Sequence, residues 1–305
     1  MTTFKTGSLL AALLALLFQA LADDAPKPST EAAKPAEDKD KEKPDPHEKL
    51  VITTNSVVID GTKIEYVARA GKLVLKNNED QPTAAIFYIS YTRTGSAVPK
   101  ARPITFSFNG GPGSSSVWLH LGLLGPRRVK LEEGGKPLPP PHTLVDNGYS
   151  LLDETDLVFI DPVSTGFSRA IKPDEAKNFH GVEEDIRSVA EFIRLYLTRN
   201  ARWESPKFII GESYGTTRAA GLSGELQNHH YININGIMLV SSVLNFQTLS
   251  FEEGNDLPYV VYFPSYAATA WYYHKLAPEL QARSLTNVLA EAEDFAAGEY
   301  NHSLL

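Results

Sequence analysis

The segment that most restricts how this chain can fold is Gly211-Glu212-Ser213-Tyr214-Gly215. Directly before it, residues 207–210 form a short apolar run that is typical of a buried strand, and residues 216–226 after it are compatible with a helix. A serine between two such glycines predicts a sharp turn from strand to helix, because side chains beside the serine would crowd the backbone there. We therefore expect a sheet on which Ser213 projects as a candidate nucleophile.

The surrounding pattern predicts a mostly parallel sheet with helices between its strands. Apolar runs at 104–108, 156–161 and 235–241 read as further buried strands. Between them, residues 182–197 carry apolar side chains at helical spacing, which is typical of an amphipathic helix that crosses over a sheet. Strand, helix and strand in this order indicate an α/β fold.

Antiparallel strands are expected before this parallel part. Residues 57–93 contain short runs rich in β-branched and aromatic residues, as strands and hairpins do. Three pairs of turn-forming residues separate the runs: Asp60-Gly61, Ala70-Gly71 and Asn77-Asn78. At the other end, residues 251–305 are rich in Tyr, Ala and Glu and are expected to be mainly helical. The main core is thus expected at 50–250.

The first 49 residues are expected to lie outside that core. Lys5 precedes an apolar run at 9–18, and Ala20-Leu21-Ala22 fits a cleavage pattern, so residues 1–22 are predicted to be a signal peptide. The run is shorter than the roughly 20 residues that span a bilayer, so no stable membrane anchor is expected after cleavage. Residues 23–49 are almost entirely Asp, Glu, Lys, Pro, Ala and Ser, which predicts a disordered linker. The protein is therefore expected to be secreted or periplasmic.

Composition excludes several classes of function. The formal net charge is -8 and no cluster of Lys and Arg stands out, so no nucleic-acid partner is expected. The chain has no cysteine, which rules out disulfides, thiolate metal sites and a cysteine nucleophile. No spacing of His, Asp and Glu suggests a metal site, and we expect no cofactor.

A second motif, Asn109-Gly110-Gly111-Pro112-Gly113, follows the predicted strand at 104–108. In folds that carry a serine at a strand-to-helix turn, the loop after an earlier strand donates one backbone N–H to the oxyanion hole. The residue after the nucleophile donates the other. Gly111 and Tyr214 are therefore the candidates for these two donors.

Together, FNGGPGSSS, IIGESYG and IDPVSTGFSR resemble the motifs of the serine carboxypeptidase family, which has the α/β-hydrolase fold. The resemblance extends from about residue 53 to the end of the chain. It implies release of the C-terminal residue of a peptide through an acyl-enzyme on Ser213. It also implies that the Asn109 side chain, the Gly110 N–H and Glu212 hold the free C-terminal carboxylate of the peptide substrate. Ser114 departs from the family pattern, since many members have a disulfide-forming cysteine there.

Glu212 carries an expectation about pH. A carboxyl group and a substrate carboxylate share a hydrogen bond only when one of the two is protonated. Activity is therefore expected to favour acidic pH. Asp161 and the Pro162-Val163 turn are expected to shape the wall of the site and to take no part in the chemistry.

The acid and the histidine that activate such a serine are not evident. This fold supplies them in the order Ser, Asp, His, from loops that follow later strands, and the chain shows one convincing strand, 235–241, after Ser213. The remaining Asp and His in the helical stretch do not follow strands: Asp256, His274, Asp294 and His302. We therefore expect a truncated form with a partial helical cap, without the last core strands and inactive alone. Residues 236–240 would then be an exposed apolar edge, prone to aggregation.

Two alternatives stay open at this point. A serine esterase or acyltransferase would use the same parts, since the fold does not fix the substrate. A secreted peptide-binding remnant without catalysis would fit the absence of a histidine and an acid. Asn109 together with Glu212 favours recognition of a free carboxylate.

Overall fold

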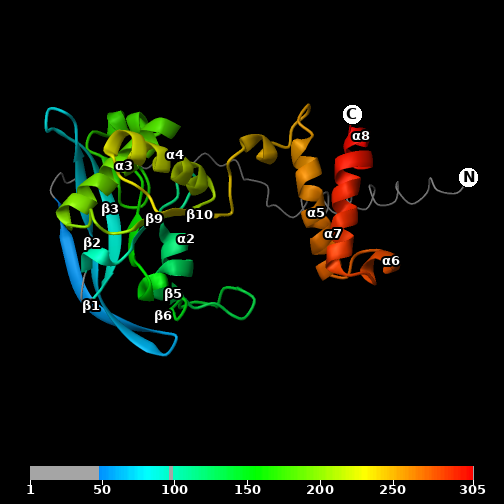
Figure 1. Ribbon diagram of the computed structural model, residues 1–305, viewed down its shortest axis with the longest axis horizontal. Coiled ribbons are helices and arrows are strands. Elements are labelled where there is room, and N and C mark those ends of the chain that lie inside the picture. Colours follow the sequence, from blue (N-terminus) through cyan, green and yellow to red (C-terminus); the bar gives the residue numbers. More distant parts are fainter. Residues whose placement is uncertain (1–47, 96–98, 305) are drawn as a thin grey trace, which may run out of the picture. The chain divides into compact units, whose positions relative to one another are not determined.

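The computed structural model describes residues 48–95 and 99–304, and its largest element is an eight-stranded sheet (Figure 1). Seven strands lie in the order β1-β2-β3-β7-β4-β9-β10, and β8 pairs with β3. Their bounds are β1 Leu50–Ile59, β2 Thr62–Lys76, β3 Pro82–Arg93, β4 Ile104–Phe108, β7 Asp156–Ile160, β8 Arg169–Ala170, β9 Lys207–Glu212 and β10 Gly236–Val240. Strands β7, β4, β9 and β10 are parallel, whereas β1, β2 and β3 pair antiparallel, as predicted.

Helices cover both faces of the parallel part. On one face, α3 (Val182–Arg199) and α4 (Tyr214–His230) pack against β4, β7 and β9. The other face is covered by α2 (Val117–Leu119), η2 (His120–Leu124) and η3 (Leu151–Asp153). All five residues of β4 and of β7 are buried, as expected for central parallel strands that are apolar on both faces. Helix α3, which buries one face against the sheet, confirms the amphipathic helix predicted at 182–197.

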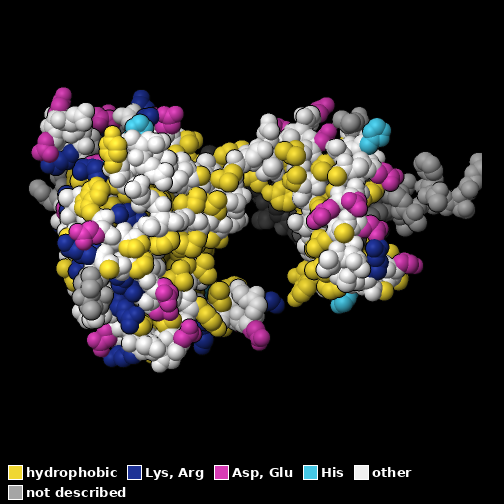
Figure 2. All heavy atoms as spheres, viewed as in Figure 1, with side chains coloured by type: hydrophobic (Ala, Val, Ile, Leu, Met, Phe, Trp, Pro, Cys, Tyr) yellow, Lys and Arg dark blue, Asp and Glu magenta, His cyan; other side chains and the backbone are white. Residues whose placement is uncertain are grey.

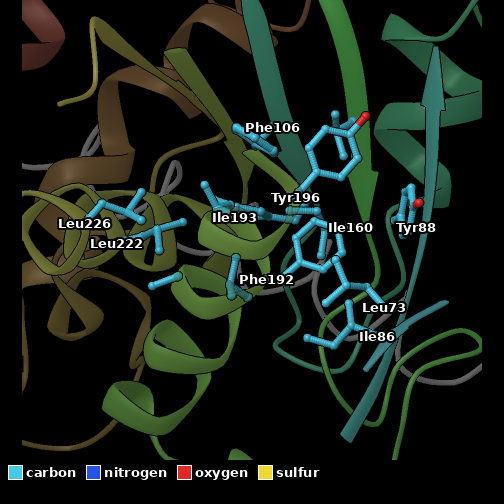
Figure 3. Close-up of a cluster of buried hydrophobic side chains, with 14 of the residues drawn as sticks. Leu73, Ile86, Tyr88, Phe106, Ile160, Phe192, Ile193, Tyr196, Leu222 and Leu226 are labelled. Atoms are coloured by element: carbon cyan, nitrogen blue, oxygen red, sulfur yellow. The ribbon is translucent and has the colours of Figure 1, made fainter. Parts of the chain in front are cut away.

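Aliphatic and aromatic side chains together fill the core between α3 and the sheet (Figure 3). Tyr196 of α3 lies edge-on to Phe106 of β4 and to Tyr88 of β3, with ring centroids 5.8 and 5.5 Å apart. Phe192, one turn earlier on α3, contacts the Tyr88 ring at 5.4 Å. Edge-on pairs of this kind add about 0.5–1.5 kcal/mol each beyond the burial of their area. These contacts fix α3 on the sheet.

The predicted turn at Ala70-Gly71 is wrong, because β2 runs through it without a break. Gly71 pairs with Leu50 on one side and with Tyr88 on the other. A Cβ at Gly71 would lie 2.5 Å from the Lys49 carbonyl oxygen, so the glycine permits a close approach of two strands. The turns predicted at Asp60-Gly61 and Asn77-Asn78 do separate strands.

The beginning of the described chain lies closer to the sheet than predicted. The predicted linker extends to residue 49, but the Glu48 carboxylate already accepts a hydrogen bond from Val74 N, at 2.9 Å, and pairs with Arg199. The signal peptide at 1–22 and the linker up to residue 47 fall outside the described residues.

Short elements complete the part up to residue 250. They are η1 Pro99–Ala101, β5 Arg127–Val129, β6 Leu144–Asp146, η4 Pro173–Phe179 and η5 Phe246–Leu249. Strands β5 and β6 form a separate two-stranded sheet that the sequence pattern did not predict.

The predicted helical stretch after residue 250 is confirmed. It consists of α5 Leu257–Tyr272, α6 Pro278–Gln281, α7 Leu285–Phe295, η6 Ala296–Tyr300 and α8 Asn301–Leu304. Phe263 of α5 contacts the rings of Phe295 and Tyr300, with centroids 5.4 and 4.9 Å apart. Within the described residues, every helix is too short or too polar to cross a membrane.

The sheet ends at β10, and no described strand pairs with the outer edge of that strand. Ile237 and Met238 of β10 remain 39% and 40% exposed. Hydrophobic side chains gather at the surface of the region where Figure 1 places β10 and α2 (Figure 2). The exposed apolar edge predicted at 236–240 is therefore present.

Candidate active site

Parallel pairing brings the two glycine motifs to the same edge of the sheet. Strand β4 pairs with β9, and Phe108 lies opposite Gly211. The loop at 109–116 therefore begins beside the turn that carries Ser213. In the sequence these two segments are about a hundred residues apart, and the carboxyl ends of neighbouring parallel strands are where α/β folds place their sites.

Ser213 has the strained backbone that the sequence predicted for a turn between β9 and α4. Its φ and ψ are 57° and -126°, a conformation that residues other than glycine seldom adopt. A Cβ at Gly211 would lie 2.0 Å from the Gly215 carbonyl oxygen. A Cβ at Gly215 would lie 2.9 Å from the Phe108 carbonyl oxygen. Both glycines are therefore required by the tight packing of strand, turn and helix.

Hydrogen bonds fix the turn to the neighbouring strand. The Ser213 N–H donates to the Val240 carbonyl at 3.0 Å. The Thr216 hydroxyl donates to the Ser213 carbonyl at 2.7 Å and accepts a hydrogen bond from Val243 N at 2.8 Å. The strained residue is thus held by the last strand of the sheet and by the segment that follows it.

The glycine-rich loop packs directly on the Ser213 turn. A Cβ at Gly110 would lie 2.4 Å from Tyr214 N and 2.7 Å from the Glu212 carbonyl oxygen. Gly111 has φ +105°, which disfavours any side chain there. The two residues named as oxyanion-hole donors, Gly111 and Tyr214, therefore belong to segments in contact with each other.

The structure also joins the two side chains predicted to bind a carboxylate. Asn109 is fully buried, and its Nδ2 donates to Glu212 Oε2 at 2.9 Å. The Asn109 Oδ1 accepts from Leu119 N at 3.0 Å, which fixes which way the amide points. Glu212 is half-buried beside Ser213. A carboxyl group and an amide are therefore held rigidly next to the candidate nucleophile.

Asp161 contacts the end of the glycine-rich loop, as expected for a residue that shapes the wall of the site. Its Oδ1 accepts from Ser116 N at 2.9 Å, and a Cβ at Gly166 would lie 1.9 Å from its Oδ2. Burial raises the pKa of the Asp161 carboxyl, and hydrogen bonds from the backbone of Ser116 and Phe167 oppose this rise. The side chain connects the end of the loop to the turn after β7.

The sequence patterns did not single out Arg218 and Asp185, which form a buried ion pair at the site. Arg218 Nε donates to Asp185 Oδ2 at 2.7 Å, and the two residues are 1% and 6% exposed. One signal was available: Asp185 stands four residues before Val189 and so shares the buried face of α3. A charge on such a face needs a partner.

Of the Asp and His residues after Ser213 in the described chain, Asp256 lies at the end of the connection from β10 to α5, and the others lie in or next to helices. Asp256 immediately precedes α5, His274 follows that helix, Asp294 is in α7 and His302 is in α8. Asp294, His274 and His302 are exposed. Among residues 48–95 and 99–304, no histidine is hydrogen bonded to the Ser213 hydroxyl.

A parallel sheet with a serine at a strained strand-to-helix turn and a glycine-rich loop beside it defines an α/β-hydrolase fold. Residues 67–301 match the model of the serine carboxypeptidase family. The chain belongs to that family.

Individual relatives match part of the chain. Serine carboxypeptidase-like 45 of Arabidopsis thaliana is 28% identical over 184 residues, which cover 56% of this chain and 36% of the relative. The pheromone-processing carboxypeptidase KEX1 of Saccharomyces cerevisiae is 30% identical over 172 residues, which cover 53% of this chain and 22% of KEX1. A crystal structure of a form of that prohormone-processing carboxypeptidase has a TM-score of 0.49 and 20% identity, covering 76% of this chain and 53% of the other. The chain spans about a third or less of the length of these curated relatives.

Proposed function

We propose that this chain carries the nucleophile and the carboxylate-binding site of a serine carboxypeptidase that releases C-terminal residues from peptides. The observation that carries the proposal is the part-buried hydrogen bond from Asn109 to Glu212, directly beside Ser213. In the proposed complex, the Asn109 amide, the Gly110 N–H and the Glu212 carboxyl hold the free C-terminal carboxylate. The last peptide bond of the substrate then lies over Ser213.

The proposed reaction proceeds through an acyl-enzyme. The Ser213 Oγ attacks the carbonyl carbon of the last peptide bond, and the N–H groups of Gly111 and Tyr214 donate to the developing oxyanion. The C–N bond breaks as the leaving nitrogen takes up the proton given up by Ser213 Oγ, and the free amino acid departs. Water then attacks the ester, its hydroxyl forms the new carboxyl group, and its other proton returns to Ser213 Oγ. Because one of the two facing carboxyl groups must be protonated, activity rises towards acidic pH.

A serine hydroxyl needs a general base to be an efficient nucleophile. In the part of the chain that the structure describes, no histidine is hydrogen bonded to the Ser213 hydroxyl. This observation favours a second candidate function for the chain alone, which is binding of a peptide C-terminus without turnover. The two functions share the carboxylate site and differ in whether Ser213 is acylated.

The first test compares an N-acyl dipeptide with its C-terminal amide. Calorimetry of the full chain at about pH 5 is expected to show tighter binding of the free acid, and mass spectrometry reports any released amino acid. The control variant Ser213→Ala is expected to keep the preference for the acid and to lose all release. Equal affinity for acid and amide contradicts carboxylate recognition, and equal turnover of both supports an esterase or acyltransferase.

We propose, in addition, that the chain is exported, on the basis of its charged and apolar first 22 residues. The test is the N-terminal sequence of the native protein. A mature N-terminus near residue 23 supports export, whereas an intact Met1 on the native protein contradicts cleavage.

A further inference from the structure

We propose that Arg218, together with Asp185, is a positioning residue that sets the direction of the Gly110 N–H, the backbone donor assigned to the carboxylate-binding site. The inference rests on the proposed function, because it explains how the groups assigned there are held in place. Arg218 lies on α4, and its side chain is fully buried. Its guanidinium contacts the loop at 109–112 at the carbonyl oxygens of Asn109 and Pro112.

Arg218 uses its planar guanidinium to join three segments of the chain. Its Nη1 donates to the Asn109 carbonyl oxygen at 2.7 Å, and its Nη2 lies 3.5 Å from the Pro112 carbonyl oxygen. Its Nε donates to Asp185 Oδ2 of α3 at 2.7 Å. The fixed fork of an arginine suits several acceptors at once, which a single ammonium group does not.

The bond from Arg218 to Asn109 determines the orientation of the next N–H. In a trans peptide the C=O and the N–H point in opposite directions, and the peptide between Asn109 and Gly110 is trans. A guanidinium that holds the Asn109 carbonyl therefore turns the Gly110 N–H to the side away from Arg218. That N–H is the backbone donor assigned to the substrate's carboxylate.

The following peptide is held in the same manner from within the loop. The Gly110 carbonyl accepts a hydrogen bond from Ser114 N at 3.0 Å. The Gly111 N–H is consequently turned away from Ser114, since this peptide is also trans. The direction of the Gly110 N–H thus depends on the bond from Arg218, and the direction of the Gly111 N–H depends on the bond from Ser114.

The guanidinium also connects the loop to the Ser213 turn. Its central carbon lies 5.2 Å from the ring centroid of Phe108, the last residue of β4, and 5.2 Å from that of Tyr214. Contacts of this kind between a cation and a ring are attractive and are strengthened by burial. One buried group therefore touches both segments that supply the oxyanion hole.

Asp185 makes the buried cation tolerable. Both side chains are removed from water, so removal of either one leaves an uncompensated charge in the interior. Removal of both charges avoids this cost. The double variant Asp185→Asn with Arg218→Met therefore separates the positioning role from simple loss of stability.

A second buried Arg–Asp ion pair, at the opposite ends of the parallel strands, provides a control. Arg202 Nη1 donates to Asp156 Oδ2 at 2.6 Å, and the two residues are 7% and 2% exposed. Asp156 begins β7, whereas Arg218 contacts the loop that follows the end of β4. Asp156 also pairs with Arg102, so Arg202→Met removes a buried arginine without leaving Asp156 unpaired.

The experiment measures the ratio of the dissociation constants of the amide and the acid of one N-acyl dipeptide, by calorimetry on the full chain. Urea unfolding of each variant reports stability. We expect D185N/R218M to unfold cooperatively and to lose at least about tenfold of the preference for the acid, as when a charge-assisted hydrogen bond is removed. We expect R202M to lose stability and to keep the preference.

A second variant covers the case in which the double variant does not fold. Arg218→Lys keeps the charge next to Asp185, but its single ammonium group does not reproduce the fork. It is expected to fold and to show a reduced preference for the acid. A folded D185N/R218M or R218K protein with the full preference overturns the positioning role. If the unmodified chain shows no preference at all, the proposed function fails and this inference fails with it.

Discussion

His120 is expected to make the folded state sensitive to acid. It is 7% exposed, and its Nε2 lies 2.7 Å from the Tyr91 hydroxyl. Its ring also lies 4.5 Å from the ring of Phe159, between centroids. Burial lowers the pKa of His120 from its ordinary value of 6.5 to about 4, because a protonated imidazole would lose its hydration. The folded chain therefore holds this histidine neutral.

The sign of the effect follows from proton binding. Between pH 6.5 and about 4, the unfolded chain protonates His120 and the folded chain does not. The contribution to stability is therefore complete above pH 6.5 and is lost as the pH falls through this window. The two pKa values differ by about 2.5, which corresponds to a loss of about 3 kcal/mol in the free energy of unfolding.

The assay is urea unfolding, followed by tryptophan fluorescence, at a series of pH values from 7.5 to 4. His120→Gln is the matched control, because its amide can still bond with the Tyr91 hydroxyl and has no charge to gain. The unmodified chain is expected to lose about 3 kcal/mol more than H120Q over this range. Parallel pH profiles for the two proteins would refute the reasoning, since they would show that His120 does not titrate differently on folding.

Three further predictions concern single residues. Ser213→Gly should raise the free energy of unfolding by about 1 kcal/mol, because glycine adopts a φ of 57° without strain; an unchanged urea midpoint contradicts this. Gly110→Ala should lower stability by about 1–3 kcal/mol and abolish the acid preference in calorimetry, because its Cβ meets Tyr214 N; unaltered binding contradicts the loop geometry. Ile237→Lys should reduce self-association through the exposed edge of β10, as measured by sedimentation velocity. Lys63→Arg, at an exposed position of β2, is the neutral control, and equal self-association of the two variants contradicts the role of the β10 edge.

The sequence predicted those parts of the site that depend on neighbouring residues. The strand-to-helix turn at Ser213 requires glycines at fixed offsets, so a short segment is enough to recognise it. The apolar spacing in α3 is likewise a local pattern. The glycine-rich loop was identified by its place after a strand, and parallel pairing of β4 with β9 then brought it to the turn.

The remaining features depend on contacts between distant segments. Gly71 resembled a turn residue, and only its neighbours Leu50 and Tyr88 show that it permits close approach inside a strand. The pairing of Arg218 with Asp185 joins two helices, and no local pattern specifies which charges meet. The burial of His120 also depends on the fold, because His120 is in η2 whereas its partner Tyr91 is in β3, 29 positions earlier in the chain.

The distance along the chain between the two halves of the site has a kinetic consequence. Asn109 and Glu212 are 103 positions apart, and Arg218 reaches back 109 positions to the Asn109 carbonyl. Contacts of such long sequence separation form late, because the intervening chain must first be ordered. During refolding, the ability to bind a carboxylate should therefore return together with the central parallel strands, later than the β1–β2 hairpin. A carboxylate ligand would then act as a reporter of the completed sheet.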